Sequence, residues 1–399
     1  MKILAVIITS PAYSASGAVT AAKNLSLATA NLCDLHLAIM SHEDSETKNN
    51  NLIIKKFKCR NRLFKSSSKI SNQIKNSFWT SDIDKYIEEF KPDIVHFHNP
   101  VPPLALWTLA KVCIKNSIPY VISSHGFVEM FDYKKSYNIG FLKGLAVNPM
   151  ILSPFYKTLN HAEAIFLLSP NENAIVEKNI SFKKRISIIP NGYDESYNKD
   201  ANRDIANQCI SKFNIDLNKP VFLYIGNHTF NKGIDVILNS LKYTNKDFQI
   251  IIGGKIRSKE EHDLLISSCD LLEGESRYSF TDFLSEEEAI ALYKIADCFI
   301  FPSRADTFPL VILEAMISEL PVISTKVGGI PYQISPECGI LIDPNSPKSL
   351  ASAMDDMLKN PLKMIEMGKN SKKRVIDKFT WKKSANIAIK EYADILGSK

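Results

Sequence analysis

Residues 301–324, FPSRADTFPLVILEAMISELPVIS, contain the pattern that decides the fold. An apolar strand ends in a polar loop, a segment with apolar residues at helical spacing follows, and a second apolar strand begins after Pro321. A strand, a helix and another strand in this order predict one unit of a parallel sheet, because parallel strands need a crossover connection that is usually a helix.

The same alternation continues along the chain on both sides of this stretch. In the second half the expected strands are VFLYIG (221–226), FQIIIGG (248–254), YSFTDF (278–283), CFIFPS (298–303), PVIST (321–325) and CGILID (338–343). In the first half they are KILAVII (2–8), LHLAIM (35–40), DIVHFHN (93–99), PYVISS (119–124) and AIFLLS (164–169). The pattern predicts an α/β protein with two doubly wound parallel-sheet domains.

The boundary between the two domains is expected near IIPNGYDESYNKDANRD (188–204), where the apolar pattern lapses. A chain of 399 residues exceeds the size at which one core stops growing. We therefore expect domains at residues 1–195 and 196–379, with a helix over about 380–399 packing back on the first domain. Ser346 and Pro347 predict the start of a helix. A cleft between two domains is a common ligand site.

Composition excludes several classes of protein. Apolar residues make up 45% of the chain and charged residues 23%, which is typical of folded globular domains. No apolar run approaches the roughly 20 residues of a membrane span, and the N-terminal MKILAVII has a better use as a first strand than as a signal peptide. The seven cysteines are scattered without metal-binding spacing, which indicates reduced thiols in a cytoplasmic protein. Nothing in the sequence indicates nucleic-acid binding.

Two carboxylates of the stretch 301–324 are candidates for ligand contacts. Asp306 precedes the helix that is expected to begin near Pro309, so an N-cap role is as good an interpretation as a sugar-binding role. Glu314 lies on or beside the apolar face of the same helix. A buried carboxylate needs a hydrogen-bond donor, either from the protein or from ligand hydroxyls. The free amides of residues 307–311 form a plausible cradle for a diphosphate.

A second candidate loop is YIGNHTFNKGIDVILNSL (224–241). A strand ends at Gly226, and Lys232 and Gly233 open a helix. This arrangement places an ammonium group and free amides where a phosphate can bind, because ligands of parallel sheets bind beyond the carboxyl ends of the strands. By itself the pattern is weak, since Lys-Gly before a helix is often a solvated start and the Walker spacing is absent.

Taken together, these segments resemble the retaining family-four glycosyltransferases of GT-B fold. In the second half the matching segments are IGNHTFNKG (225–233), FTDFLSEEEAIALYKIADCFIFPS (280–303), the segment from Asp306 to Glu314 with the following Ala-Met, PVISTKVGGIPYQI (321–334) and CGILIDP (338–344). In the first half they are PDIVHFHNP (92–100), SSHGF (123–127), LLSPNE (167–172) and IIPNGYD (188–194). The resemblance implies two Rossmann-like domains that face each other across a cleft.

The resemblance also implies roles for individual residues. Glu314 would bind the ribose of a nucleotide, and Asp306 would lie near the hydroxyls of the transferred sugar. Lys232 and the amide of Gly17 would bind the diphosphate. His125 would lie near the anomeric centre of the donor; without the resemblance it would be interpreted as a satisfied histidine of a cleft wall. The remaining donor-binding residues in this comparison are Asn227, Thr307, Phe308, Leu310 and Val311.

Two positions depart from the family pattern. The family usually has Glu where this chain has Asp306, which keeps a carboxylate on a shorter arm. It usually has Arg where this chain has Asn227, so one charge-assisted phosphate contact is missing. Arg304 and Lys255 are candidates to replace it, and otherwise the diphosphate is held more weakly by Lys232.

Two other groups of residues are candidate metal ligands but have simpler interpretations. Asp82 and Asp84 have the spacing of metal-dependent transferases, yet they fall at an expected helix start, where acidic residues interact favourably with the helix dipole. His96 and His98 share one face of a strand without an evident third ligand, which indicates sheet packing and lining of a cleft. We expect no metal ion and no cofactor.

The resemblance implies an enzyme that transfers a sugar, with retention of configuration, from a UDP-sugar or GDP-sugar to a glycan or lipid-linked acceptor. Similarity to polysaccharide-assembly enzymes points to bacterial surface polysaccharides as the pathway. Two alternatives stay open: a GT-B nucleotide-sugar epimerase, and a catalytically weakened subunit that only binds a sugar nucleotide. Donor turnover with and without an acceptor distinguishes the three.

A basic stretch in the first half is a candidate membrane surface. Residues 50–81 contain no acidic residue, and their basic residues are Lys55, Lys56, Lys58, Arg60, Arg62, Lys65, Lys69 and Lys75. Basic residues with apolar neighbours can bind anionic lipid, which would place the protein at the inner face of the cell membrane. The alternative interpretation, of equal weight, is a strand at NLIIKKF (51–57) followed by a solvated loop.

Overall fold

The computed structural model describes residues 1–8, 16–61, 79–99, 102–125, 152–180, 182–256, 258–271, 274–281 and 283–398. The chain divides into two compact units. Unit 1 contains Met1–Gly192 and Trp381–Lys399, and unit 2 contains Tyr193–Thr380. Among the described residues, no helix is both long and apolar enough to span a bilayer.

The sheet of unit 2 has the order of a doubly wound fold. Its strands are β11 (Val221–Ile225), β12 (Gln249–Gly253), β13 (Tyr278–Phe280), β14 (Cys298–Phe301), β15 (Val322–Thr325) and β16 (Gly339–Ile342). They lie in the order β13-β12-β11-β14-β15-β16, and all neighbouring strands are parallel. The chain winds outward in one direction from β11 and in the other from β14. The boundary between β11 and β14 is therefore the topological switch point, where ligands of such sheets bind.

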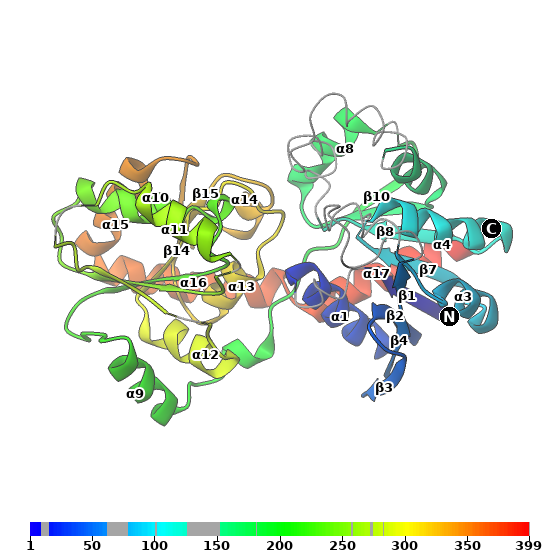
Figure 1. Ribbon diagram of the computed structural model, residues 1–399, viewed down its shortest axis with the longest axis horizontal. Helices are drawn as coiled ribbons and strands as arrows, with labels where there is room; N and C mark the ends of the chain where they lie inside the picture. Colours follow the sequence, from blue (N-terminus) through cyan, green and yellow to red (C-terminus); the bar gives the residue numbers. More distant parts are fainter. Residues whose placement is uncertain are drawn as a thin grey trace. The chain divides into compact units, whose positions relative to one another are not determined.

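Helices cover both faces of this sheet (Figure 1). They are α9 (Arg203–Lys212), α10 (Ile234–Ser240), α11 (Lys259–Ser267), α12 (Glu286–Ile295), α13 (Leu310–Ile317), α14 (Ile330–Gln333), α15 (Pro347–Lys359) and α16 (Pro361–Lys378). On one face α10 packs against α15, and on the other α13 packs against α16. The predicted start of α15 is confirmed: the Ser346 side chain accepts a hydrogen bond from the Ser349 amide, and Pro347 is the first helical residue.

Unit 1 contains an eight-stranded sheet in the order β10-β9-β8-β7-β1-β2-β4-β3. Its strands are β1 (Lys2–Ile7), β2 (Asp34–Ser41), β3 (Ser45–Asn49), β4 (Leu52–Lys58), β7 (Ile94–His98), β8 (Tyr120–Ser123), β9 (Ala164–Leu167) and β10 (Arg185–Ile188). All pairs are parallel except β3 with β4. The sequence pattern does not predict β3, a short polar strand at the edge of the sheet, nor β10.

Both faces of this sheet are also covered by helices. α1 (Gly17–Ala30) packs with α17 (Trp381–Gly397) on one face, and α3 (Ile83–Phe90) packs with α4 (Pro103–Lys115) on the other. The buried residues form two separate apolar clusters, one on each face. The predicted fold class, α/β with two Rossmann-like parallel-sheet domains, is confirmed. Two short strands, β5 (Arg60–Asn61) and β6 (Trp79–Thr80), form a separate antiparallel pair.

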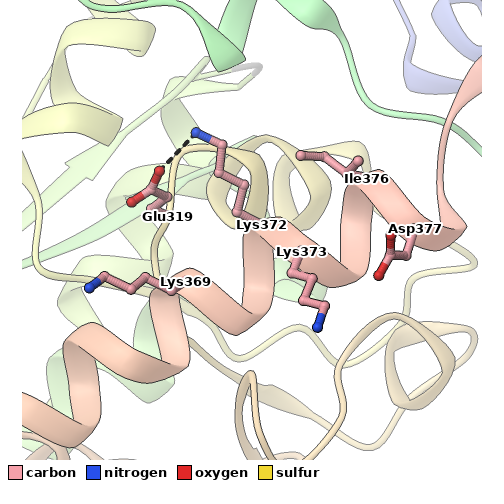
Figure 2. Close-up of a pocket in the computed structure, with 6 residues that line it drawn as sticks. All are labelled: Glu319, Lys369, Lys372, Lys373, Ile376 and Asp377. Carbon is pink, nitrogen blue, oxygen red and sulfur yellow. Dashed lines mark hydrogen bonds and ion pairs between the residues drawn. The ribbon is translucent and has the colours of Figure 1, made fainter.

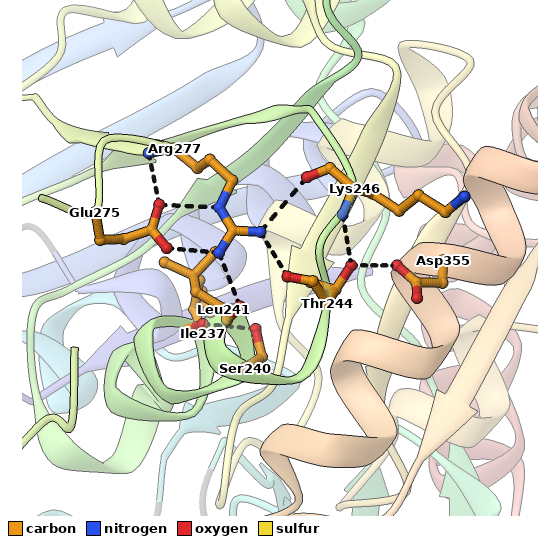
Figure 3. A network of polar contacts seen from close by, with 8 residues as sticks. All are labelled: Ile237, Ser240, Leu241, Thr244, Lys246, Glu275, Arg277 and Asp355. Atoms are coloured by element: carbon orange, nitrogen blue, oxygen red, sulfur yellow. Dashed lines mark hydrogen bonds and ion pairs between the residues drawn. The ribbon is translucent and has the colours of Figure 1, made fainter. Parts of the chain in front are cut away.

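A polar network lies at the start of β13 in unit 2. It joins the residue before this strand to the segment that follows α10. The Arg277 guanidinium donates to the carbonyl oxygens of Leu241 and Thr244, each at 2.8 Å, and forms a two-point ion pair with Glu275 (Figure 3). Thr244 in turn donates to Asp355 of α15. Arg277 therefore satisfies the carbonyls that follow α10 and ties them to β13.

We expect Arg277→Met to lower the free energy of unfolding of unit 2 by about 3 kcal/mol, because the change removes the ion pair of Glu275 and the donor of two carbonyl oxygens, leaving Glu275 only its backbone donors. Thermal melting, with hydrogen exchange to localise the loss, measures the effect. Arg203→Met removes an exposed arginine from the first turn of α9 and is the matched control. Equal melting temperatures of the two variants would contradict the role of this network.

Candidate active site

The candidate site of unit 2 is built from the loops that follow β11 and β14. These strands are neighbours at the switch point of the sheet, so their loops emerge side by side. The loop after β11 contains the short 3-10 helix η4 (Phe230–Lys232), and the loop after β14 contains Asp306. The two stretches that the sequence singled out are therefore brought together.

Lys232 and Asp306 form an ion pair between these loops. The distance from Lys232 Nζ to Asp306 Oδ2 is 2.5 Å, and the two side chains are 23% and 16% exposed. The N-cap residue of α13 is Pro309, so the interpretation of Asp306 as the helix cap is wrong. Its carboxylate instead reaches the cation of the neighbouring loop.

Two glycines allow the loops to approach this closely. Gly233 has φ of 76°, and a Cβ there would come within 2.1 Å of the carbonyl oxygen of Pro302, at the end of β14. Gly328, in the turn after β15, has φ of 51° and leaves the same kind of space for the carbonyl oxygen of Asp306, so it lets this turn approach the loop after β14. Side chains at either position would separate the loops, because left-handed φ disfavours them and the backbone atoms opposite cannot move aside.

Glu314 lies on α13, mostly buried, and has the hydrogen-bond donor that the sequence predicted. The Tyr293 hydroxyl of α12 donates to Glu314 Oε2 at 3.2 Å, and the Tyr197 ring packs edge-on against Tyr293 at 5.6 Å. Burial raises the pKa of the Glu314 carboxyl to about 7, although the bond from Tyr293 favours the ionised form. Asp194 and Glu286 raise this pKa further.

A raised carboxyl pKa means that ionised Glu314 destabilises the folded unit. This penalty appears as pH rises from the ordinary value of 4.5 toward about 7 and is complete above that. We expect Glu314→Gln to raise the free energy of unfolding at pH 8 by up to about 3 kcal/mol, and the melting temperature with it. Near pH 4.5 the substitution should have little effect. Glu319→Gln is the control, because the bond from Lys372 lowers the pKa of Glu319. A Glu314→Gln shift that is the same at both pH values would contradict this account.

The first turn of α13 presents backbone amides rather than side chains. Its N-cap, Pro309, makes no side-chain capping bond. Phe308 is only 4% exposed, and its ring packs against Phe379. The Phe308 side chain therefore does not face a ligand. Thr307, Leu310 and Val311 are partly buried, and all three lie beside the Asp306 loop.

The proposed replacements for the missing arginine do not behave alike. Arg304 forms a two-point ion pair with Asp235, at 2.5 and 2.7 Å, and donates to the carbonyl oxygen of Phe230. The Arg304 guanidinium thus holds the loop, and its role as a replacement phosphate ligand stays a prediction. Lys255 follows β12 and is exposed. The backbone carbonyl oxygen of Asn227 accepts a hydrogen bond from the Tyr224 hydroxyl.

In unit 1, three histidines gather where β7 and β8 end. The rings of His98 and His125 are 5.9 Å apart, and those of His96 and His98 are 4.0 Å apart. Burial lowers the pKa of His125 to about 4 and that of His96 to about 3, and it holds the pKa of His98 well below 6.5. All three are therefore neutral near pH 7.

These histidines differ in their hydrogen bonds. His96 is fixed at both ring nitrogens, by Ser123 Oγ at 2.7 Å and by the Tyr392 hydroxyl at 2.6 Å. In the described part of the chain, His98 Nδ1 and His125 Nε2 are buried without a hydrogen-bond partner. These two atoms therefore have unused hydrogen-bonding capacity. Gly17, the first residue of α1, is exposed and follows the N-cap Ser16.

The sequence reasoning did not single out Glu172, which positions the loop before His125. Its Oε2 accepts from the Ser124 hydroxyl at 2.8 Å, and its Oε1 accepts from the amides of Leu168 and Ser169. The capping box of Ser169 and Glu172 is the signal that could have revealed this role. The contacts of Tyr293 with Glu314 had no such signal, because they join two helices that are distant in sequence.

Within the described ranges, no group of three or more His, Cys, Asp or Glu side chains is arranged to hold a metal ion. Asp82 is the N-cap of α3 and pairs with Lys85 at 2.9 Å, and Asp84 lies in the first turn of that helix. A helix start accounts for both acidic residues.

A surface hollow of about 340 Å³ lies at the other end of α13 from Asp306 (Figure 2). It is lined by Glu319, Lys369, Lys372, Lys373, Ile376 and Asp377. Lys372 pairs with Glu319 at 2.8 Å, and the other two lysines leave α16 in different directions. These cations do not converge on a common point, so the hollow does not compete with the loops after β11 and β14 as the candidate site.

Two family models match the chain. Residues 207–374 match the model of the glycosyl transferases group 1, and residues 15–197 match that of glycosyltransferase family 4. Together the two matches span most of both units and contain Gly17, His125, Lys232, Asp306 and Glu314.

Curated relatives are similar at low identity. An uncharacterized glycosyltransferase of Methanocaldococcus jannaschii is 25% identical over 77% of each chain. The D-rhamnosyltransferase WbpZ of Pseudomonas aeruginosa is 26% identical over 56% of this chain and 57% of its own. The O-antigen chain mannosyltransferase C of Escherichia coli is 24% identical over 60% of this chain and 63% of its own.

Solved structures share the fold over the whole chain. Sucrose-phosphate synthase of Thermosynechococcus elongatus superposes with a TM-score of 0.77 at 20% identity, covering 100% of both chains. The Anabaena protein HepE in complex with UDP superposes with a TM-score of 0.71 at 15% identity, covering 99% of this chain and 100% of its own.

Proposed function

Because the chain belongs to the group 1 glycosyltransferases and has the GT-B fold, we propose that it moves a sugar from a nucleotide diphosphate sugar to a glycan or lipid-linked acceptor. The observation that carries this proposal is the pairing of Lys232 with Asp306 across the two loops at the switch point of unit 2, beside the helix α13 that bears Glu314. UDP in the HepE complex supports a nucleoside diphosphate as the leaving group of the donor. We propose that the donor is a UDP-sugar or a GDP-sugar.

Each group of the site has a part in this reaction. Lys232 and the amides of Thr307, Phe308, Leu310 and Val311 bind the diphosphate and stabilise the charge that develops as the nucleotide leaves. Glu314 accepts hydrogen bonds from the ribose, and Asp306 accepts them from the transferred sugar. Asn227 lies at the start of the same loop as Lys232. In this mechanism no metal ion neutralises the leaving group, so we expect a chelator to leave activity intact.

Unit 1 supplies His125 and the amide of Gly17. The neutral His125 ring, with its free Nε2, can exchange a hydrogen bond with a sugar hydroxyl. Glu172 makes a poor nucleophile, because three donors already bind its carboxylate. We therefore favour transfer on the front face of the donor sugar, with the anomeric configuration retained.

Surface polysaccharide assembly is the proposed setting. Two relatives of this chain, a D-rhamnosyltransferase and an O-antigen chain mannosyltransferase, support it. An enzyme in such a pathway works in the cytoplasm, and a lipid-linked acceptor would bring it to the inner face of the cell membrane.

Donor turnover tests the proposal. Purified protein is incubated with a panel of UDP-sugars and GDP-sugars, with and without a lipid-linked or oligosaccharide acceptor, and the released nucleoside diphosphate is measured. We expect one donor to be consumed much faster when the acceptor is present. Epimerised sugar without an acceptor would indicate an epimerase, and binding without turnover would indicate a binding subunit.

The basic stretch of residues 50–81 gives a separate prediction. Leu52–Lys58 of this stretch form β4, as the strand interpretation predicted. Arg62, Lys65, Lys69 and Lys75 lie outside the described residues. Lys55 pairs with Glu46 at 3.1 Å. Lys56 and Lys58 are exposed at alternate positions of β4, so they share one face of that strand, and Arg60 of β5 is exposed as well.

We expect salt-sensitive binding to anionic vesicles that weakens about tenfold or more when Lys56, Lys58 and Arg60 become Gln, because each basic residue near such a surface contributes about 1 kcal/mol. Substituting Arg62 and Lys55 as well should weaken it further. Vesicle co-sedimentation measures the binding. The matched control replaces Lys363, Lys369 and Lys373 of α16, which are exposed and change the charge equally. Equal losses in both triple variants would leave only the solvated-loop interpretation.

A further inference from the structure

Lys232 and Asp306 form an ion pair within unit 2. Their 2.5 Å contact joins side chains that are both mostly shielded from solvent. Such a pair is screened less than a fully exposed one, so breaking it has a measurable cost. A diphosphate that uses Lys232 must therefore compete with a carboxylate of the same chain.

The backbone holds this pair in place. The Arg304 amide donates to the carbonyl oxygen of Asn231 at 2.8 Å, and the Ser303 hydroxyl donates to the same oxygen at 3.0 Å. The close approach of Gly233 to Pro302 reinforces these bonds. The loops after β11 and β14 are thus fixed to each other on both sides of the ion pair, which makes the contact a built feature.

Lys232 is also the cation on which a diphosphate would depend most. The two loops, residues 226–233 and 302–309, are fully described, and their basic side chains are Lys232 and Arg304. Arg304 is held by Asp235 in a two-point pair. Position 227 is the uncharged Asn227. Any change in the state of Lys232 should therefore change phosphate affinity directly.

We propose that Asp306 competes with the diphosphate for Lys232 and thereby favours the sugar-bearing donor over the nucleoside diphosphate product. This inference rests on the proposed function. When the donor is bound, sugar hydroxyls occupy the Asp306 carboxylate, and Lys232 is free for the phosphates. Once the sugar has been transferred, Asp306 loses those partners and recaptures Lys232. The nucleotide then leaves faster, because it has lost its main cation.

Binding of UDP and GDP to wild-type protein and to Asp306→Asn tests the proposal. Asn keeps the size of the side chain and removes its charge. We expect the dissociation constant of the nucleoside diphosphate to fall about fivefold in Asp306→Asn, a size that fits a partly exposed ion pair. The dissociation rate should fall similarly. Binding of uridine or guanosine, which lack phosphate, should not change.

Two further variants separate this mechanism from a general charge effect. Glu319→Gln removes a carboxylate that pairs with Lys372 at 2.8 Å at the other end of α13, so it gives the same change in net charge and should leave affinity unchanged. Lys232→Gln should weaken the diphosphate, and adding Asp306→Asn to it should give no gain, because the competing contact is already absent.

The outcomes distinguish this inference from the proposed function. If wild-type protein binds a nucleoside diphosphate and Asp306→Asn binds it no more tightly, the inference is overturned and the proposed function stands. An equal gain in Asp306→Asn and Glu319→Gln, or a gain that persists without Lys232, overturns it as well. If no nucleoside diphosphate binds the wild-type protein, the proposed function fails and the inference fails with it.

Discussion

Glu314→Ala is expected to lower kcat/KM for the nucleotide-sugar donor by about a thousandfold. The change removes the carboxylate that would hold the ribose, and the Tyr293 hydroxyl keeps only the Val311 carbonyl oxygen as its acceptor on α13. Loss of a buried, charge-assisted contact of this kind costs several kcal/mol. Initial rates of donor consumption over a range of donor concentrations measure it. Melting of the variant provides the folding control.

Asp306→Ala provides the contrast. Its carboxylate is assigned to the reacting sugar, so this variant should lose mainly kcat and retain binding of the nucleoside diphosphate. A residue that holds the leaving part and a residue that acts on the sugar thus give different kinetic signatures. Undiminished activity in both variants would remove the assignment of the site.

His125→Ala is expected to lower kcat by about a hundredfold or more without a matching rise in KM. His125 Nε2 is buried and has no hydrogen-bond partner in the described residues, so a contact with the reacting sugar is the use the site offers it. Positioned hydrogen-bonding groups at a reacting centre contribute on this scale.

The pH dependence provides an independent check on His125. Because burial lowers its pKa to about 4, the imidazole is neutral from pH 6 to pH 8, and its protonation should not shape the rate in that range. Any inflection near pH 7 should come from Glu314, whose pKa is about 7, and it should disappear in Glu314→Gln. An inflection near pH 6 that disappears in His125→Asn instead would contradict the assignment.

The fold could be predicted from the sequence to a large extent. Buried parallel strands appear as continuous apolar runs, and every run singled out in the two halves is a strand in the structure. β3 escaped prediction because an antiparallel edge strand such as Ser45–Asn49 needs no apolar residues. β10 escaped because its residues Arg185–Ile188 adjoin the loop taken as the domain boundary.

The site could be predicted only in part. The positions of Lys232 and Asp306 follow from a general rule, that ligand loops lie at the carboxyl ends of strands. Their mutual pairing does not follow, because it depends on the strand order that makes β11 and β14 neighbours and on the backbone space at Gly233. The ion pair of Arg304 with Asp235 does not follow from this rule either, since the two residues are far apart in sequence.

The roles of individual residues in the reaction remain predictions. Phe308 illustrates how packing limits such assignments: its side chain belongs to the core with Phe379, so only its backbone can serve a ligand. Sequence similarity identifies the position of a residue, whereas burial decides which of its atoms a ligand can reach.

Calorimetric titration of the protein with UDP and with GDP tests the central claim most directly, that unit 2 holds a nucleotide diphosphate between Lys232, the first turn of α13 and Glu314. The account predicts saturable binding of one of the two nucleotides at one site, weakened at least a hundredfold in Glu314→Ala and clearly weakened in Lys232→Gln. Failure of both nucleotides to bind, or binding that is undiminished in these two variants, would contradict it.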